Sequence, residues 1–179
     1  MDLMEAIRSR RSIRKFQDKP VSQEVVAQLM EAVMWSPSWA NTQCWELVRV
    51  EDPARRAKLQ ETMGKGNPAT KAIVSAPLLF VLCGRLKVSG YYKGEVTTKF
   101  GDWFMFDLGL ACQNLCLAGH GLGLGSVVVG LFDQDAAAKV VEAPEGCEVV
   151  AMIPMGYPAQ EVKAPKRRPP EEFLRVDHF

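Results

Sequence analysis

Apolar residues along this chain recur at intervals that predict several helices. After Ser22 they return every three or four residues until Ser36-Pro37, which predicts an amphipathic helix ended by the proline. A longer segment, residues 100–121, is apolar on nearly all sides, so we expect a central, buried helix. The other predicted helices each follow a capping residue: a short one after Asp2, one from Asp52-Pro53 to about residue 64, and one over 133–142.

Four runs rich in β-forming residues predict strands between these helices. They cover residues 45–50, 77–83, 125–129 and 148–155. Strands and helices together predict a mixed α/β domain with about four strands and helices on both sides of the sheet. Prolines recur from residue 156 onward, which predicts an extended tail. Residues 1–179 are therefore expected to form a single domain that ends in this tail.

The run of glycines between Gly119 and Gly125 has the spacing of a dinucleotide-binding loop, but its context argues against one. Such a loop follows a strand and opens a helix. These glycines end a helix and lead into a strand. A helix C-cap followed by a tight turn is the better interpretation.

Composition and charge narrow the function classes. The formal net charge of the 179 residues is only +1, so we expect no nucleic-acid partner. No apolar signal segment opens the sequence, and no 18-residue run lacks polar residues, so we expect no membrane span. Five cysteines without a secretory signal favour reduced thiols in a cytoplasmic protein. With two histidines and no Cys-x-x-Cys pair we expect no metal site, and Cys112 and Cys116 are better explained as core thiols.

Positive charge is nevertheless concentrated near the two ends of the chain. Five of the eight residues from Arg8 to Lys15 are basic, and a second cluster covers residues 166–168. Forked guanidinium donors with a hydroxyl between them suit one compact phosphate group. The alternative is two solvated surface stretches. A third feature, the loop over 36–45, carries Ser, Asn and Gln beside tryptophans; these are ordinary turn formers or the edge contacts of a flat heterocycle.

Taken in order, these pieces resemble the FMN-dependent nitroreductase family over essentially the whole chain. The pieces are Arg10-Arg11-Ser12-Ile13-Arg14-Lys15-Phe16, then Pro37-Ser38-x-x-Asn41-x-Gln43-x-Trp45, then Asp107-Leu108-Gly109 through Gly125-Ser126, and finally Gly156-Tyr157-Pro158 with Lys166-Arg167-Arg168. The resemblance implies an α+β fold with a mixed, largely antiparallel sheet flanked by helices. It also implies an intertwined homodimer with FMN at the interface. An isolated subunit would then expose an apolar helix face around Phe104, Leu108 and Leu115.

The resemblance also implies a role for particular residues toward FMN. Arg10, Arg11, Ser12 and Arg14 would hold the phosphate and the pyrimidine edge, with Lys166 and Arg168 closing over the phosphate. Pro37, Ser38, Trp39 and Asn41 of the partner would line one flavin face, while Val128, Val129 and Gly130 line the other, the Gly130 N–H directed at flavin N5. Lys71 would lie near flavin N1 and O2 and stabilise the anionic reduced flavin. Asn67 is one residue out of the usual spacing.

Two departures from the family pattern affect substrate choice. Trp39 stands where the family usually has a small residue, and Cys44 stands where it usually has proline. Cys44 is better explained as a small core residue than as a redox group. The segment over 84–99, where larger members carry lid helices, is short, and Tyr91 and Tyr92 would partly replace that cover. With Trp39 they form the expected substrate pocket.

The activity implied by the resemblance is that of an FMN-dependent NAD(P)H oxidoreductase. It would reduce small electron-poor acceptors such as nitroaromatics, quinones or flavins by a ping-pong hydride mechanism. No side chain is assigned a catalytic acid or base role. The alternatives are another redox reaction on the same scaffold, such as dehalogenation or azoline oxidation, and a flavin-binding protein without turnover.

Overall fold

A four-stranded sheet forms the centre of the computed structural model, which describes all residues from 1 to 179. Its strands lie in the order β1 (Trp45–Arg49), β2 (Leu78–Arg85), β6 (Cys147–Gly156) and β5 (Gly125–Ser126). Each neighbouring pair is antiparallel. The parallel component is limited to an isolated bridge between Ser12 and Ser126. The expected α+β class with a largely antiparallel sheet is thus confirmed.

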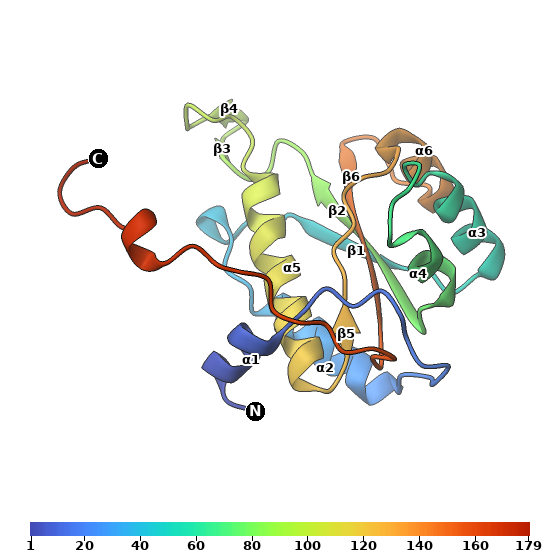
Figure 1. Cartoon of the computed structure of the whole chain (residues 1–179). Helices are drawn as coiled ribbons and strands as arrows, with labels where there is room; N and C mark the ends of the chain where they lie inside the picture. Colours follow the sequence, from blue (N-terminus) through green and yellow to red (C-terminus); the bar gives the residue numbers. More distant parts are fainter.

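Helices cover both faces of this sheet (Figure 1). One face carries α2 (Gln23–Met34) and α5 (Phe104–Gly121); the other carries α3 (Pro53–Glu61), α4 (Thr70–Ser75) and α6 (Gln134–Val141). The short α1 (Leu3–Ser9) begins at Asp2, whose carboxylate accepts from the Glu5 N–H, and lies against α5. None of the helices combines the length and the apolarity that a bilayer-spanning segment requires.

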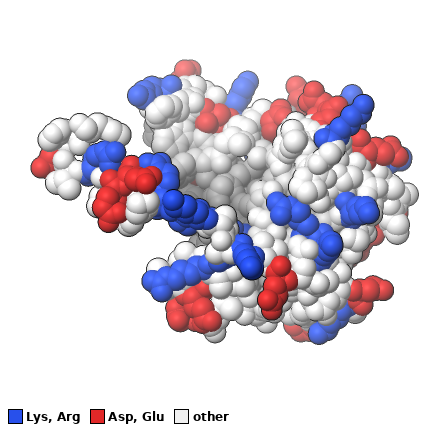
Figure 2. All heavy atoms as spheres, in the orientation of Figure 1, with Lys and Arg blue, Asp and Glu red and all other residues white.

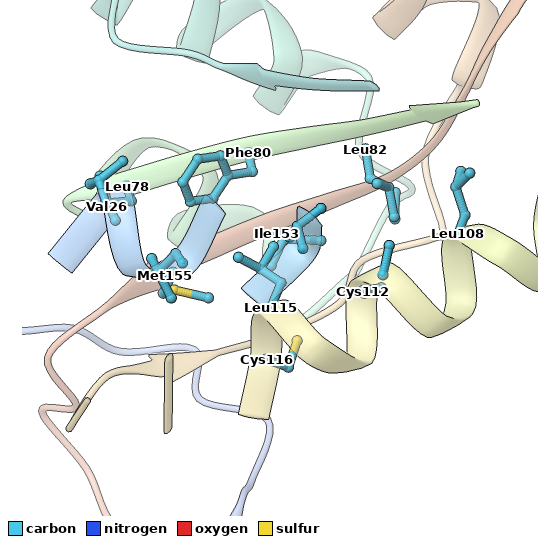
Figure 3. Close-up of a cluster of buried hydrophobic side chains, with 14 of the residues drawn as sticks. Val26, Leu78, Phe80, Leu82, Leu108, Cys112, Leu115, Cys116, Ile153 and Met155 are labelled. Atoms are coloured by element: carbon cyan, nitrogen blue, oxygen red, sulfur yellow. The ribbon is translucent and has the colours of Figure 1, made fainter. Parts of the chain in front are cut away.

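Side chains of β2 alternate between two separate cores because successive residues of a strand point to opposite faces. Leu78, Phe80 and Leu82 pack with α2 and α5, as Figure 3 shows. Leu79, Val81 and Cys83 pack with α3, α4 and α6. Burial on both faces explains why this strand is a continuous apolar run in the sequence.

The central helix α5 is present as predicted, but one expectation about it was wrong. Leu108 and Leu115 are only 1% and 0% exposed, because the sheet and α2 cover them within the same chain. The apolar residues that α5 leaves exposed are Met105 and Phe106, near its beginning. A helix that is apolar on nearly all sides has no polar face from which the buried side could be identified.

Apart from two 3-10 turns, three short elements were not predicted. They are α4 and the two strands of a hairpin, β3 (Tyr91–Tyr92) and β4 (Glu95–Val96), which lies beyond the first turn of α5 (Figure 1). The hairpin lies in the middle of a segment, residues 86–103, that we call the flap. Its base is held by a hydrogen bond from the Trp103 N–H to the Ser89 carbonyl at 3.0 Å. α5 begins at Phe104 because the flap occupies the preceding residues, and Asp102 accepts the Phe104 N–H at 3.1 Å.

The two ends of the chain run beside one another at the edge of the sheet. The Ile13 N–H donates to the Ser126 carbonyl at 2.9 Å, and the Gln17 N–H donates to the Tyr157 carbonyl at 2.9 Å. The Ala159 N–H in turn donates to the Lys15 carbonyl at 3.0 Å. Beyond these pairings the C-terminal residues extend away from the body and contain one short 3-10 helix, η2 (Pro170–Glu172) (Figure 1).

Candidate functional site

The first part of the site is the arginine segment, residues 10–14, which follows α1. Arg10 ends that helix, with its N–H bonded to the Ala6 carbonyl at 3.0 Å. Ile13 is buried, and the backbone N–H of Ile13 pairs with Ser126 of β5. This pairing fixes three arginines along the edge of the sheet, each of them only partly exposed.

Arg14 is the arginine of this segment that has a buried donor without a partner. Its Nε is buried and has no partner, and its Nη1 makes one long bond, 3.3 Å, to the Ser12 carbonyl. A buried donor left unpaired is unfavourable, and native structures rarely contain one. An anion bound beside Arg14 would satisfy this donor.

Arg11 is placed differently from its neighbours. Its Nη1 donates to the carbonyls of Arg8 and Arg10, both at 2.7 Å, so its guanidinium stabilises the end of α1. Arg10 lies near the C-terminal half of α5, where its charge acts on His120. Burial, together with the positive charges of Arg10 and Arg11, lowers the pKa of His120. The Ser9 hydroxyl donates to the Glu5 carbonyl at 2.6 Å, so it accepts from His120 Nε2 at 2.7 Å.

The second part is the valine strip, residues 126–131, which continues from β5. Val129 is buried and pairs with Met152 of β6, whereas Val128 is 49% exposed. The Gly130 N–H makes no hydrogen bond, and no heavy atom lies within 4 Å of the place where a Cβ would stand. The strip therefore offers an open, largely apolar edge that includes the unbonded Gly130 N–H.

Asn67 and Lys71 lie beside the end of this strip. Asn67 Nδ2 donates to the Leu131 carbonyl at 3.1 Å, and its Oδ1 accepts the Ala69 N–H at 2.9 Å. These bonds attach the beginning of α4 to the valine strip, and Lys71 is exposed in the first turn of that helix. The sequence left the role of Asn67 open. In the structure its side chain forms a hydrogen bond to the backbone of the valine strip.

The third part is the tryptophan loop, residues 37–44, which contains the 3-10 turn η1 (Trp39–Asn41). Ala40, Asn41 and Gln43 all have positive φ, at 45°, 55° and 48°, which is unfavourable for residues other than glycine. The Gln43 N–H donates to Ser38 Oγ at 2.9 Å, and Gln43 Nε2 donates to Asn41 Oδ1 at 3.1 Å. Pro37 and Asn41 are exposed, and Ser38 and Trp39 are half-buried.

Asp107 of α5 holds this loop, a role that sequence reasoning missed. Its side chain is completely buried, and its Oδ1 accepts the Trp39 N–H at 3.0 Å. Its Oδ2 accepts the Ser89 hydroxyl at 2.6 Å, with Thr42 Oγ1 at 3.5 Å and Cys44 Sγ at 3.6 Å. The sequence offered one signal for this role, because Asp107 is the single carboxylate in an otherwise apolar helix and a buried carboxylate needs hydrogen-bond partners.

Cys44 is completely buried beside this carboxylate. Burial first, and the negative charge of Asp107 second, raise the pKa of the Cys44 thiol to about 12. The thiol therefore stays protonated and donates toward Asp107, which agrees with a core residue and not with a reactive thiolate.

One chain places the arginine segment at the beginning of the valine strip and α4, which carries Lys71, near its end, but the tryptophan loop lies elsewhere. The loop is bonded to Asp107 in the first turn of α5, whereas Ser9 next to the arginine segment is bonded to His120 in the last turn. The 18 residues of α5 extend over roughly 27 Å at 1.5 Å per residue. The two halves of the expected site are therefore at opposite ends of one helix.

The remaining expected site residues lie on the tail and on the flap. Arg168 is exposed and bonded to Glu172, by Nε to Oε2 at 3.1 Å, and no hydrogen bond joins Lys166 or Arg168 to the arginine segment. Basic side chains of the tail and of the region around α1 border a recessed, largely uncharged area (Figure 2). Tyr92 is 64% exposed on the flap hairpin, and Tyr91 is half-buried beside it.

Comparison with known proteins identifies the family. The nitroreductase family model matches residues 7–73 and 71–157. The FMN reductase (NAD(P)H) of Bacillus subtilis is 30% identical over 184 residues, which cover 97% of this chain and 72% of that protein. A 5,6-dimethylbenzimidazole synthase of Rhodospirillum rubrum is 28% identical over 175 residues, covering 88% of this chain and 82% of the relative.

The fold comparison agrees with these relatives. The crystal structure of a nitroreductase family protein from Clostridium difficile superimposes with a TM-score of 0.84 and covers 100% of both chains, at 22% identity. The shared fold extends over the whole chain, and the sequence match includes the arginine segment, the tryptophan loop, α5 and the valine strip. The chain belongs to the nitroreductase family.

Proposed function

We propose that this protein is an FMN-dependent NAD(P)H oxidoreductase that reduces small electron-poor acceptors. The observation that carries the proposal is the unpaired, buried Arg14 Nε, which lies in a segment of three arginines beside the valine strip. A doubly charged phosphate supplies the acceptor that this donor lacks. The name of the Bacillus subtilis relative, an FMN reductase, supports FMN as the phosphate-bearing ligand.

The residues of this chain fit FMN in three places. Arg10, Ser12 and Arg14 would hold the phosphate and pyrimidine edge, with Arg11 fixing the end of α1 and Lys166 and Arg168 approaching from the tail. The open valine strip, with Val128 exposed and the Gly130 N–H unbonded, would lie along one flavin face. Lys71 would supply a positive charge at the same edge. Bound there, FMN would supply the two-electron redox chemistry between NAD(P)H and the acceptor.

We propose a homodimer as the functional form, since one chain cannot build the whole site. The tryptophan loop lies at the opposite end of α5 from the arginine segment, so Pro37, Ser38, Trp39 and Asn41 would serve the partner's flavin. Exposed Trp35, Met105 and Phe106 provide apolar surface for such contact. The near-neutral charge and the five free thiols support a cytoplasmic protein without a nucleic-acid partner.

We expect sedimentation of the purified protein to give a dimer that carries two FMN. The reason is that a monomer would contain only half of each proposed site. The measurement is sedimentation velocity at micromolar concentration, with flavin absorbance followed beside protein absorbance. An active, flavin-loaded monomer would contradict the shared site.

The proposed activity is tested by anaerobic titration of the purified protein. We expect FMN absorbance that NADH or NADPH bleaches and that a quinone or nitroaromatic restores. Titration without an acceptor separates the two half-reactions. Bound flavin that neither nucleotide bleaches would indicate a flavin-binding protein without turnover, and protein that binds no FMN would contradict the proposal.

A further inference from the structure

The buried carboxylate of Asp107 connects two segments that are far apart in the sequence. Through Oδ1 it holds the tryptophan loop by the Trp39 N–H at 3.0 Å, and through Oδ2 it holds the flap by the Ser89 hydroxyl at 2.6 Å. Its third connection is covalent, because it belongs to the first turn of α5. No cation pairs with this buried carboxylate, and its hydrogen-bond partners all come from these two segments.

Both segments are conformationally demanding and depend on such a connection. The tryptophan loop holds three residues other than glycine at positive φ, a backbone that persists only when its surroundings enforce it. The flap contains little regular structure apart from the two-residue strands of its hairpin. Ser89 is completely buried, so its hydroxyl would lack an acceptor without Asp107.

We propose that Asp107 is a positioning residue that determines acceptor specificity. This inference rests on the proposed function and on the acceptor pocket expected from the sequence, which Trp39 of the loop and Tyr91 and Tyr92 of the flap would line. One carboxylate fixes the loop relative to the flap, and so the position of the indole relative to the two tyrosines. Asp107 does not touch the reacting atoms; it acts through the Trp39 backbone and the Ser89 hydroxyl.

Cys44 also donates a hydrogen bond to Asp107, a contact that requires the cysteine of this chain. Proline, the residue expected here from the family pattern, would offer no donor. Here the protonated thiol points at Asp107 Oδ2 at 3.6 Å. The loop is thereby attached to the carboxylate at its beginning by Trp39 and at its end by Cys44.

Hydrogen exchange in the flavin-free protein tests the connection without relying on activity. In Asp107→Ala we expect amide exchange in residues 37–44 to rise about tenfold or more relative to β2 and β6, because a hydrogen bond to a charged acceptor is lost. The matched control is Gln60→Ala, which removes a part-buried hydrogen bond of 2.9 Å to the Thr70 carbonyl on the other face of the sheet. It should leave exchange in residues 37–44 unchanged relative to those strands.

Steady-state kinetics of the FMN-loaded variant test the specificity. The ratio of kcat/KM for a bulky and a compact acceptor should change by roughly threefold or more, through KM and not kcat, and Trp39→Ala should change it in the same direction. Unchanged loop exchange or an unchanged ratio in folded Asp107→Ala protein would overturn the proposal. If that variant does not fold, Ser89→Ala tests the proposal instead. Faster amide exchange in residues 86–103 together with a changed kcat/KM ratio would support the proposal, and wild-type exchange and ratio would overturn it.

The same measurements separate this inference from the proposed function. Wild-type protein that binds no FMN, or that NAD(P)H cannot bleach, contradicts the proposed function and with it the specificity role. The exchange result would still decide whether Asp107 holds the loop.

Discussion

Replacing Arg14 by alanine is expected to weaken FMN binding by about tenfold or more. The guanidinium of Arg14 contains a buried nitrogen without a partner, so in the proposed complex it is free to donate to phosphate oxygens. A charge-assisted hydrogen bond of this kind contributes on the order of 1.5–3 kcal/mol. Equilibrium dialysis with FMN measures the loss directly.

Riboflavin, which lacks the phosphate, provides the ligand control for this variant. Its weaker binding should be nearly the same in wild-type and Arg14→Ala protein. The protein control is Arg175→Ala, which also removes one positive charge, but from an exposed guanidinium already bonded to tail carbonyls. Equal loss of FMN and riboflavin would show that Arg14 supports the fold and not the phosphate.

The structure also ranks the other basic residues. Arg10→Ala should resemble Arg14→Ala, and the double variant of Lys166 and Arg168 should also lower FMN affinity about tenfold. Arg11→Ala should have a smaller effect on affinity, because its Nη1 already bonds the Arg8 and Arg10 carbonyls. From the sequence alone, the three arginines of the arginine segment could not be distinguished.

The parts of the fold that the sequence predicts well are those with a strong local signal. Periodic apolar residues predicted α2, and capping aspartates predicted α3 and α6. α4 was not predicted because it has only six residues. Hydrogen bonds to Asn67 organise its first turn, so it shows no hydrophobic periodicity in the sequence. The buried face of α5 could not be predicted for the opposite reason. Apolar residues lie on nearly all sides of this helix, so the sequence does not show that Leu108 and Leu115 are buried.

The candidate site shows the same division between local and long-range information. The arginine segment and the tryptophan loop were expected from short motifs that the sequence displays. The link from Asp107 to Trp39 joins residues 68 positions apart, and the bond from Ser9 to His120 joins residues 111 apart. Contacts at such separations depend on how α5 packs, so periodicity and capping signals carry no information about them.

Substitution of Gly125 by alanine is expected to disrupt both the fold and the arginine segment. A Cβ at this position of β5 would lie 2.6 Å from Ile13 Cγ1 and 2.7 Å from Ile13 Cβ. The second contact involves an atom bonded to the backbone, so a change of rotamer cannot relieve it. Ile13 must move with its backbone, which weakens the 2.9 Å bond from its N–H to Ser126 and displaces the neighbouring arginines.

We expect Gly125→Ala to lower the free energy of unfolding by about 1–3 kcal/mol and to weaken FMN binding about tenfold or more. Urea denaturation of the flavin-free protein and equilibrium dialysis measure the two effects. The control is Gly121→Ala at the end of α5, where a Cβ would have no heavy atom within 4 Å and a helical alanine is favourable. Gly121→Ala should keep wild-type stability and affinity.

A double-mutant cycle with Ile13→Ala tests whether a methyl group at position 125 clashes with the Ile13 side chain, as the distances indicate. Ile13→Ala removes Cγ1 and Cγ2, which would lie 2.6 and 3.0 Å from the new Cβ, but keeps the Ile13 backbone and its Cβ. The loss of stability caused by Gly125→Ala should therefore be smaller in the Ile13→Ala background than in the wild type. Strict additivity would mean that Cγ1 and Cγ2 of Ile13 do not contribute to the clash, because the Cβ contact at 2.7 Å is present in both backgrounds. Wild-type FMN affinity in Gly125→Ala would show that the arginine segment does not depend on the glycine.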